Sequence, residues 1–382
     1  MERAAPTRLL SLDVFRGLTI AGMLLVNDPG SWGAIYPPLE HAAWHGWTPT
    51  DLIFPFFLFI VGVTTHLSLG SRRARGATDR DIVLQILRRG AIIILLGWLM
   101  AGFPYYPLTR ITAIRIGGVL PRIGVCYIAG ALLTMKTTLK QQVVILAVLL
   151  YGYWFLQTLV PVPGQNEIGA LLLDRPDATL SAWLDRTVLG LPHLWVGSVT
   201  WDPEGILSTI PAIGTVILGV FTGRWLTRKQ VPMAERLNAM FVVGAIAMMV
   251  GLMWNWSFPI NKNLWTSSYV MFTGGMAAVA LAACVWLVDV RMIRWWTRPF
   301  VIYGTNPILA YVGSGVMARI IYSLIKVPYG GRIVSLQTAI YEAAFASWLA
   351  PRNASLAFAV CIVLFWLGIL TVLYRRKIFL KV

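Results

Sequence analysis

Long apolar runs alternate with short polar segments along the whole chain. An α-helix needs about 20 mostly apolar residues to cross roughly 30 Å of hydrocarbon. By that measure the pattern predicts about ten transmembrane helices, near residues 9–27, 50–70, 86–103, 118–135, 142–160, 205–226, 237–256, 267–288, 299–325 and 354–374. No low-complexity tract or soluble module interrupts them, so we expect an all-α integral membrane protein. It would be a polytopic helical bundle in which residues 1–382 form a single domain.

The composition excludes an ordinary soluble domain. Hydrophobic residues make up 57% of the 382 residues and charged residues only 13%, whereas globular proteins carry roughly a quarter charged residues. The net charge of +16 would indicate a nucleic-acid partner in a soluble protein. Here the basic residues gather in short segments between apolar runs, which is typical of cytoplasmic loops. We therefore expect membrane lipid, and no nucleic acid, as a partner.

The same basic bias predicts the topology. Basic residues are frequent in residues 71–88 and 227–236, whereas residues 161–204 form a longer and more acidic segment. We therefore expect cytoplasmic N- and C-termini, with residues 28–49 and 161–204 on the outer face of the inner (plasma) membrane. No small-residue cleavage signal precedes the first polar loop, so the first apolar segment is expected to be a retained span.

The cysteines predict neither a disulfide nor a metal site. Cys126, Cys284 and Cys361 are odd in number, and each lies inside an apolar run, where the reactive thiolate is disfavoured. No Gly-rich phosphate loop, His-rich metal pattern or Ser/His/Asp elbow is found along the chain. We expect a chemistry that uses neither a metal nor a cysteine.

One polar loop between two apolar helices concentrates the candidate chemistry. The first helix ends at Asn27, the loop holds His41 and His45, and the next helix begins after Asp51. Tryptophans flank the loop, as is typical of the membrane–water boundary. Chemistry placed there can meet water on one side and a lipid-buried cavity on the other.

Several polar residues lie deeper in the apolar runs than topology requires. They include Asp28, Arg122, Asn306 and Arg319. A charge at membrane depth costs at least about 2.5–3.5 kcal/mol on insertion scales, so such groups normally face a cavity or a partner. Together they predict a polar chamber, although each alone could be a satisfied packing contact. Asp13 and Arg16 stand three residues apart on one helical face and are expected to pair.

Six segments resemble one known family. The first two, in the region of the polar loop, are LDVFRGLTIAGMLLVN and LEHAAWHGWTPTDLIFPFFLFIVG. The others are WDPEGILSTIPAIGTVILG at 201–219, PINKNLWTSSYVMFTGG at 259–275, PFVIYGTNPILAYVG at 299–313 and, more weakly, GGVLPRIGVCYIAG at 117–130. From about residue 11 to residue 315 the chain resembles the transmembrane heparan-α-glucosaminide N-acetyltransferases. It resembles a bacterial-type member without the luminal N-terminal region and first helix of the eukaryotic proteins.

The resemblance implies transfer of the acetyl group of cytosolic acetyl-CoA to the amine of a glucosamine-like sugar at the outer face. It places the active-site histidine on His41 and its partner asparagine on Asn27, and it gives His45 no role. Histidine takes up a proton near neutral pH, and the Asn27 amide suits a donor to the developing oxyanion. Asp51 could orient the imidazole or hold the amino sugar. Direct transfer and an acetyl-histidine intermediate both remain open.

The remaining site residues are assigned to the two substrates. We expect acetyl-CoA to be bound by Asp13, Arg16, Arg122 and Asn306. We expect the sugar to be bound by Asp28, Asn261, Lys262 and Asn263. The alternative for the first pair, Asp13 and Arg16, is a purely structural ion pair.

Two other classes of function stay open. A transporter for an amino sugar such as N-acetylglucosamine would also use a polar chamber in a ten-span bundle, while a structural scaffold would leave the polar loop unexplained. For an enzyme without the luminal region, we expect a cell-wall or nutrient amino sugar as acceptor in place of a heparan chain. The oligomeric state is left open, with a homodimer as one form.

Overall fold

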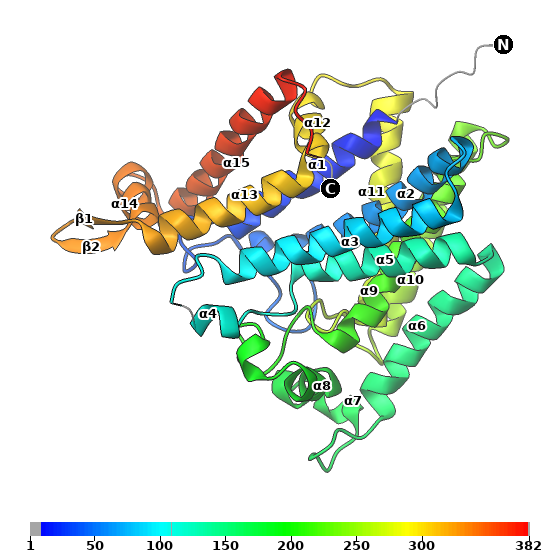
Figure 1. Ribbon diagram of the computed structural model, residues 1–382, viewed down its shortest axis with the longest axis horizontal. Coiled ribbons are helices and arrows are strands. Elements are labelled where there is room, and N and C mark those ends of the chain that lie inside the picture. Colours follow the sequence, from blue (N-terminus) through cyan, green and yellow to red (C-terminus); the bar gives the residue numbers. More distant parts are fainter. Residues whose placement is uncertain (1–8, 108, 381–382) are drawn as a thin grey trace. The chain divides into compact units, whose positions relative to one another are not determined.

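The computed structural model describes residues 9–107 and 109–380 (Figure 1). In that part of the chain the regular structure is helical except for an antiparallel hairpin of β1 (Lys326–Tyr329) and β2 (Arg332–Ser335) and one isolated bridge. Ten of its helical segments are long and apolar enough to cross a membrane, at Leu10–Asn27, Pro49–Ala74, Asp79–Gly102, Val119–Lys136, Leu139–Leu159, Ile206–Leu226, Met233–Trp254, Ser267–Val290, Pro307–Leu324 and Pro351–Arg375. Each overlaps one of the ten predicted spans, so the all-α membrane fold is confirmed. The cytoplasmic placement of both termini stays a prediction.

Residue contacts divide the described chain into two compact units. Unit 1 comprises residues 9–41, 48–54 and 279–380, and unit 2 comprises residues 42–47 and 55–278. The polar loop is therefore shared, because the chain leaves unit 1 directly after His41 and returns to it at Thr48. That the whole chain acts as one domain stays a prediction.

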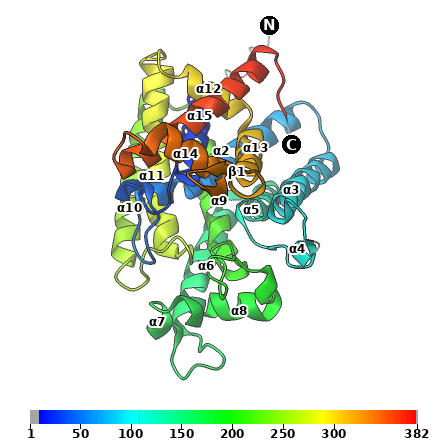
Figure 2. The same cartoon turned by 90° about the vertical axis from the view of Figure 1, so that its left-hand side faces the viewer.

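Unit 1 combines the first helix with the C-terminal part of the chain. Its elements are α1 (Leu10–Asn27), η1 (Pro37–Leu39), η2 (Pro49–Leu52), η5 (Trp286–Val290), α12 (Arg298–Thr305), α13 (Pro307–Arg319), η6 (Ile320–Leu324), the hairpin, α14 (Leu336–Tyr341), η7 (Glu342–Ala346) and α15 (Pro351–Arg375). Helix α1 contacts α12, α13 and α15, and these ribbons gather around it in Figures 1 and 2.

The closest of these contacts, between α1 and α12, depends on two glycines. A Cβ atom on Gly17 would lie 1.7 Å from the Phe300 carbonyl oxygen, and one on Gly304 would lie 2.2 Å from the Asp13 carbonyl oxygen. Only glycine allows the two backbones to approach this closely, which is a common device in membrane helix pairs.

The span expected at 299–325 is wrong as a single helix. Helix α12 ends at Thr305 and α13 begins at Pro307, and Asn306 between them has φ −130° and ψ 53°. Proline lacks the N–H that a continuous helix needs, and it disfavours the helical conformation of the preceding residue. The apolar run thus contains two helices, of which α13 with η6 keeps the length of a span.

Unit 2 is built from the central helices. Its elements are α2 (Ile53–Ala74, apart from its first two residues), α3 (Asp79–Gly102), α4 (Thr109–Thr112), α5 (Val119–Lys136), α6 (Leu139–Leu159), α7 (Gly169–Leu172), η3 (Pro176–Ala178), α8 (Leu180–Val188), η4 (Leu191–His193), α9 (Ile206–Leu226), α10 (Met233–Trp254) and the first turns of α11 (Ser267–Val285). Helix α3 packs along α5, and α9 packs against both α5 and α6. Figure 2 shows α7 and α8 at one end of α6.

The long segment 161–204 contains the short elements α7, η3, α8 and η4. Several of its acidic residues make contacts that stabilise the fold. Arg115 binds Asp202 through two hydrogen bonds of 2.7 and 2.5 Å and Glu204 through one of 2.6 Å. Asp185 on α8 accepts the Ile206 N–H at 2.9 Å, and burial raises the pKa of this carboxyl to about 7. These contacts anchor the segment to the start of α9.

Candidate active site

His41 and Asp51 form a hydrogen-bonded pair within unit 1. The His41 Nδ1 atom lies 2.6 Å from Asp51 Oδ1. The imidazole is 48% exposed, whereas the Asp51 side chain is 1% exposed. The pair therefore couples an accessible ring to a carboxylate that is fixed in the interior.

The carboxylate of Asp51 is held by the start of the helix that follows it. Its Oδ2 atom accepts the backbone N–H of Thr48 at 3.0 Å and the Thr48 hydroxyl at 3.2 Å. This is the reciprocal arrangement of a capping box at the first turn of η2. Because an ionised carboxylate only accepts hydrogen bonds, a neutral His41 imidazole donates to Asp51 from Nδ1.

His45 also pairs with a carboxylate, but in unit 2. Its Nε2 atom lies 2.9 Å from Asp174 Oδ1, and its Nδ1 atom lies 3.3 Å from the Asn261 amide nitrogen. Both ring nitrogens are thus engaged. The neighbouring Trp44 donates its indole N–H to the Leu173 carbonyl at 2.7 Å. These bonds attach the segment 42–47 to two other loops of unit 2.

Asn27 and Asp28 lie at the C-terminal end of α1, where they help to line a cavity of about 250 Å³. All of its lining residues belong to unit 1, and they are Asn27, Asp28, Pro29, Trp32, Met317, Ala318, Arg319, Ile321, Tyr322, Ser323, Gln337, Phe358 and Ile362. His41 is not among them. The structure thus groups Asn27 with Asp28 and pairs His41 with Asp51.

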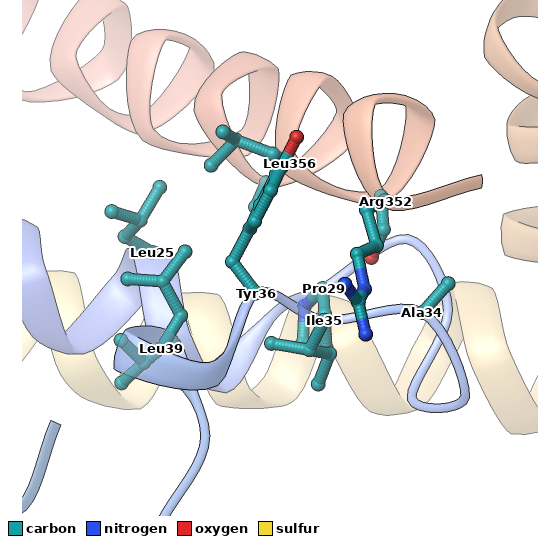
Figure 3. A pocket seen from close by; sticks show the side chains of 11 residues that line it. Leu25, Pro29, Ala34, Ile35, Tyr36, Leu39, Arg352 and Leu356 are labelled. Atoms are coloured by element: carbon teal, nitrogen blue, oxygen red, sulfur yellow. The ribbon is translucent and has the colours of Figure 1, made fainter. Parts of the chain in front are cut away.

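A second, much smaller pocket lies beside the same loop. It is lined by Leu25, Val26, Pro29, Ala34, Ile35, Tyr36, Leu39, Arg352, Ser355, Leu356 and Ala359. Figure 3 shows the Tyr36 ring rising from the loop toward Leu356, with the Arg352 side chain reaching from α15 to the loop. Its volume of about 10 Å³ is close to the minimum for a single water molecule, so it is a packing gap and no substrate site.

Of the four residues assigned to acetyl-CoA, Asp13, Arg16 and Asn306 lie in unit 1 and Arg122 lies in unit 2. Arg16 pairs with Asp13 at 3.4 Å, as expected, and also donates to the Gly304 carbonyl at 3.1 Å. The Asn306 amide donates to the Ile378 carbonyl at 3.1 Å and accepts the Leu380 N–H at 2.9 Å. These three residues tie α1, α12 and the C-terminal segment of unit 1 together. Their role toward acetyl-CoA stays a prediction.

Arg122, the fourth of those residues, is buried in unit 2. One of its terminal nitrogens donates to the Gly205 carbonyl at 3.2 Å and to the Ser208 hydroxyl. The guanidinium also lies over the ring of Trp265, 5.2 Å from its centroid. The sequence correctly placed this arginine inside an apolar run, and the contacts bind α5 to α9.

The triplet 261–263 is only partly accessible. Asn261 is fully buried, its Oδ1 accepts the Leu264 N–H at 2.9 Å, and its amide nitrogen faces His45. Lys262 and Asn263 are half-buried. The contacts of Asn261 serve the loop itself, so of the three predicted sugar contacts Lys262 and Asn263 are the more accessible.

Sequence reasoning missed several residues of the cavity. No feature of the sequence indicated that Trp32, Tyr322 or Gln337 would line a cavity, whereas Arg319 was expected to face a cavity or a partner. Gln337 and Asp28 are far apart along the chain, and no local pattern links them. Among the residues that the structure describes, no group of three or more His, Cys, Asp or Glu could hold a metal ion.

Comparison with known proteins identifies the relatives of the chain. A family model described as heparan-alpha-glucosaminide N-acetyltransferase, catalytic, matches residues 8–260. The chain is 30% identical over 426 residues to the heparan-alpha-glucosaminide N-acetyltransferase of Homo sapiens, a match that covers 99% of this chain and 60% of that protein. The protein of the same name from Mus musculus is 30% identical over 430 residues, with coverages of 100% and 61%. The chain thus spans about three fifths of the length of these curated relatives, and the predicted resemblance is confirmed over nearly its whole length.

Proposed function

The chain belongs to the heparan-alpha-glucosaminide N-acetyltransferase family, and we propose that it transfers the acetyl group of acetyl-CoA to the amine of a glucosamine-like sugar. The observation that carries this proposal is the pair of His41 and Asp51, in which a half-exposed imidazole is hydrogen-bonded to a buried carboxylate. That arrangement is the one expected of a general base that is oriented by a second group.

His41 serves as the base in this proposal. The amine nitrogen attacks the thioester carbonyl, the carbon–sulfur bond breaks, and the CoA thiolate leaves. The nitrogen loses one proton to His41 Nε2, and the imidazolium then returns a proton to the thiolate. Asp51 keeps Nδ1 protonated and stabilises the imidazolium. A direct transfer is favoured over an acetyl-histidine intermediate, because one bound arrangement of thioester and amine completes it.

Asn27 is proposed to stabilise the negative charge that develops on the thioester oxygen. Its side chain is exposed at the end of α1 and lines the cavity of unit 1. An amide N–H directed at a developing oxyanion typically contributes about 10²–10³-fold in rate. The expected signature of Asn27→Ala is a loss of turnover larger than any loss of acetyl-CoA affinity.

The location follows from the basic bias of the sequence. We propose a multi-pass protein of the inner (plasma) membrane that receives acetyl-CoA from the cytosol and the sugar from the outer face. The proposed acceptor is a cell-wall or nutrient amino sugar. Cysteines introduced at Ser31 and Thr78 are expected to react with an impermeant reagent from opposite sides of the membrane, and labelling from the same side would contradict this topology.

The decisive experiment uses the purified protein with acetyl-CoA and a panel of sugars. Mass spectrometry should detect N-acetylglucosamine and free CoA when glucosamine is present, and neither above background when glucose replaces it. Absence of an acetylated product from every amino sugar, in protein that remains folded, would contradict the proposal. Counter-flow of labelled N-acetylglucosamine into proteoliposomes without acetyl-CoA would then favour a transporter.

A further inference from the structure

The carboxylate of Asp28 faces the cavity of unit 1 and is free to bind a ligand. Asp28 is half-buried at the end of α1 and helps to line the cavity. Among the described residues its side chain has no hydrogen-bond or ion-pair partner. Burial raises the pKa of this carboxyl to about 7, because no neighbouring contact compensates for its desolvation. A cationic ligand would supply the missing partner.

The wall that carries Asp28 is firmly held. The Gly30 N–H donates to the Ser355 carbonyl at 3.2 Å, and the Gly30 carbonyl accepts from the buried Gln337 amide at 2.7 Å. A Cβ atom on Gly30 would lie 2.5 Å from the ring of Tyr341, so the glycine is required for this packing. The next residue, Ser31, donates its N–H to the Ser355 hydroxyl at 3.0 Å. The cavity is therefore bounded by fixed backbone.

The other lining groups suit a small sugar. Trp32 and Tyr322 offer aromatic faces, on which the apolar face of a sugar ring can lie, and Ser323 offers a polar group for a hydroxyl. The volume of about 250 Å³ is below the range of about 300–1,000 Å³ that holds drug-sized ligands. A single sugar ring fits this size better than an extended chain.

We propose that this cavity is the acceptor subsite, and that it binds one amino-sugar ring through an ion pair between the sugar ammonium and Asp28. This inference rests on the proposed function and adds the residue that selects an amine-bearing sugar. Since only the free amine attacks a thioester, the ammonium must lose a proton before transfer. Asp28 can receive it, as the carboxylate becomes the carboxylic acid and the ammonium becomes the amine.

The test measures equilibrium binding of glucosamine and of glucose to purified protein without acetyl-CoA. Wild type is expected to prefer glucosamine. Asp28→Asn should weaken glucosamine binding about tenfold or more, the loss expected for a charge-assisted hydrogen bond, and should leave glucose binding unchanged. Retained glucose binding shows that the variant is folded. Glu40→Gln is the matched control, because Glu40 is an exposed carboxylate of the same loop that does not line the cavity.

Two further binding measurements test the role of Trp32 and the number of sugar rings that the cavity holds. Trp32→Ala should weaken glucosamine and glucose alike, because an aromatic face does not distinguish the amine. The β-1,4-linked disaccharide of glucosamine should bind no tighter than the monosaccharide if only one ring is held. Unchanged glucosamine affinity in Asp28→Asn, or a disaccharide that binds more than about tenfold tighter, would overturn the inference.

The outcomes also separate this inference from the proposed function. If the protein transfers acetyl groups but its affinity for glucosamine does not depend on Asp28, the proposed subsite is wrong and the proposed enzymatic function stands. If glucosamine binding depends on Asp28 but the protein acetylates no sugar, the subsite stands and the proposed transferase function is wrong.

Discussion

His41 and His45 stand four residues apart in the sequence, and each pairs with an aspartate, but the two aspartates differ in exposure. In the pair of His41 and Asp51, the histidine is half-exposed and the carboxylate is 1% exposed. In the pair of His45 and Asp174, the carboxylate is 87% exposed. A buried carboxylate keeps its geometry and is little screened, whereas an exposed ion pair contributes about 0–1 kcal/mol and is weakened by salt.

The two pairs also differ in the contacts that surround them. His41 uses one ring nitrogen for Asp51, and Asp51 is fixed in turn by Thr48. His45 has both ring nitrogens engaged, one by Asp174 and one by the buried Asn261. In the proposed mechanism the first pair takes part in proton transfer, whereas the contacts of the second pair hold the segment 42–47 against other loops of unit 2.

The largest expected effect is that of His41→Ala on turnover. Removal of a general base typically lowers the rate by about 10²–10⁴-fold. The ring is half-exposed, so little cavity is created and the thermal unfolding midpoint should stay close to that of wild type. Initial rates of N-acetylglucosamine formation measure the loss. Substantial activity in well-folded His41→Ala protein would remove His41 from the mechanism.

The next largest effect is expected for Asp51→Asn. The amide cannot replace the ionic hydrogen bond to Nδ1, and loss of such a bond, about 1.5–3 kcal/mol, corresponds to roughly 10–100-fold in rate. The loss should appear in kcat, because Asp51 acts through His41. If Asp51 instead holds the sugar, the variant will raise the KM for glucosamine and leave kcat unchanged.

His45→Ala is the matched control for His41→Ala, and its main effect should be on stability. The truncation leaves the buried Asn261 amide without the ring nitrogen it faces, and an unsatisfied buried group costs about 1–3 kcal/mol. We expect a lower thermal unfolding midpoint with kcat within a few-fold of wild type. A loss of activity as large as that of His41→Ala, at unchanged stability, would reverse the assignment of the two histidines.

The smallest effect is expected for Asp174→Asn, the counterpart of Asp51→Asn. Because Asp174 is almost fully exposed, the change should alter the free energy of unfolding by less than about 1 kcal/mol. The thermal unfolding midpoint should differ little from that of wild type at both low and high salt. A marked drop in activity would show that the segment 161–204 takes part in the chemistry.

The apolar pattern predicted the positions of the spans, but it did not predict where an apolar run is interrupted. All ten long helices lie where apolar runs predict them, because a bilayer leaves few alternatives to a hydrogen-bonded helix. The break at Asn306 could have been inferred from Pro307 in the middle of the run at 299–325. The short helices within 161–204 are only three to nine residues long, and a periodic pattern needs a window of about 11–18 residues to predict a helix.

The sequence predicted some residues of the candidate site and missed others, because only some of them lie in one continuous stretch. His41, Asn27 and Asp51 lie in one short stretch that resembles a known family, so they could be predicted from the sequence alone. The pairing of His41 with Asp51 was one of two roles predicted for Asp51. The cavity with Asp28 was not predictable, because it depends on Tyr322, Gln337 and Phe358 from distant parts of the chain.

Ten apolar runs, six family-like segments and a polar loop with His41 and His45 can be recognised in the amino-acid sequence alone. These features depend on local hydrophobicity and on residue identity, and both are read directly along the chain. Which carboxylate each histidine contacts, and which polar residues share a cavity, became known from the folded structure. Such contacts join residues separated by up to about 300 positions, such as Gly30 and Gln337, and they arise from the packing of helices that no local pattern encodes.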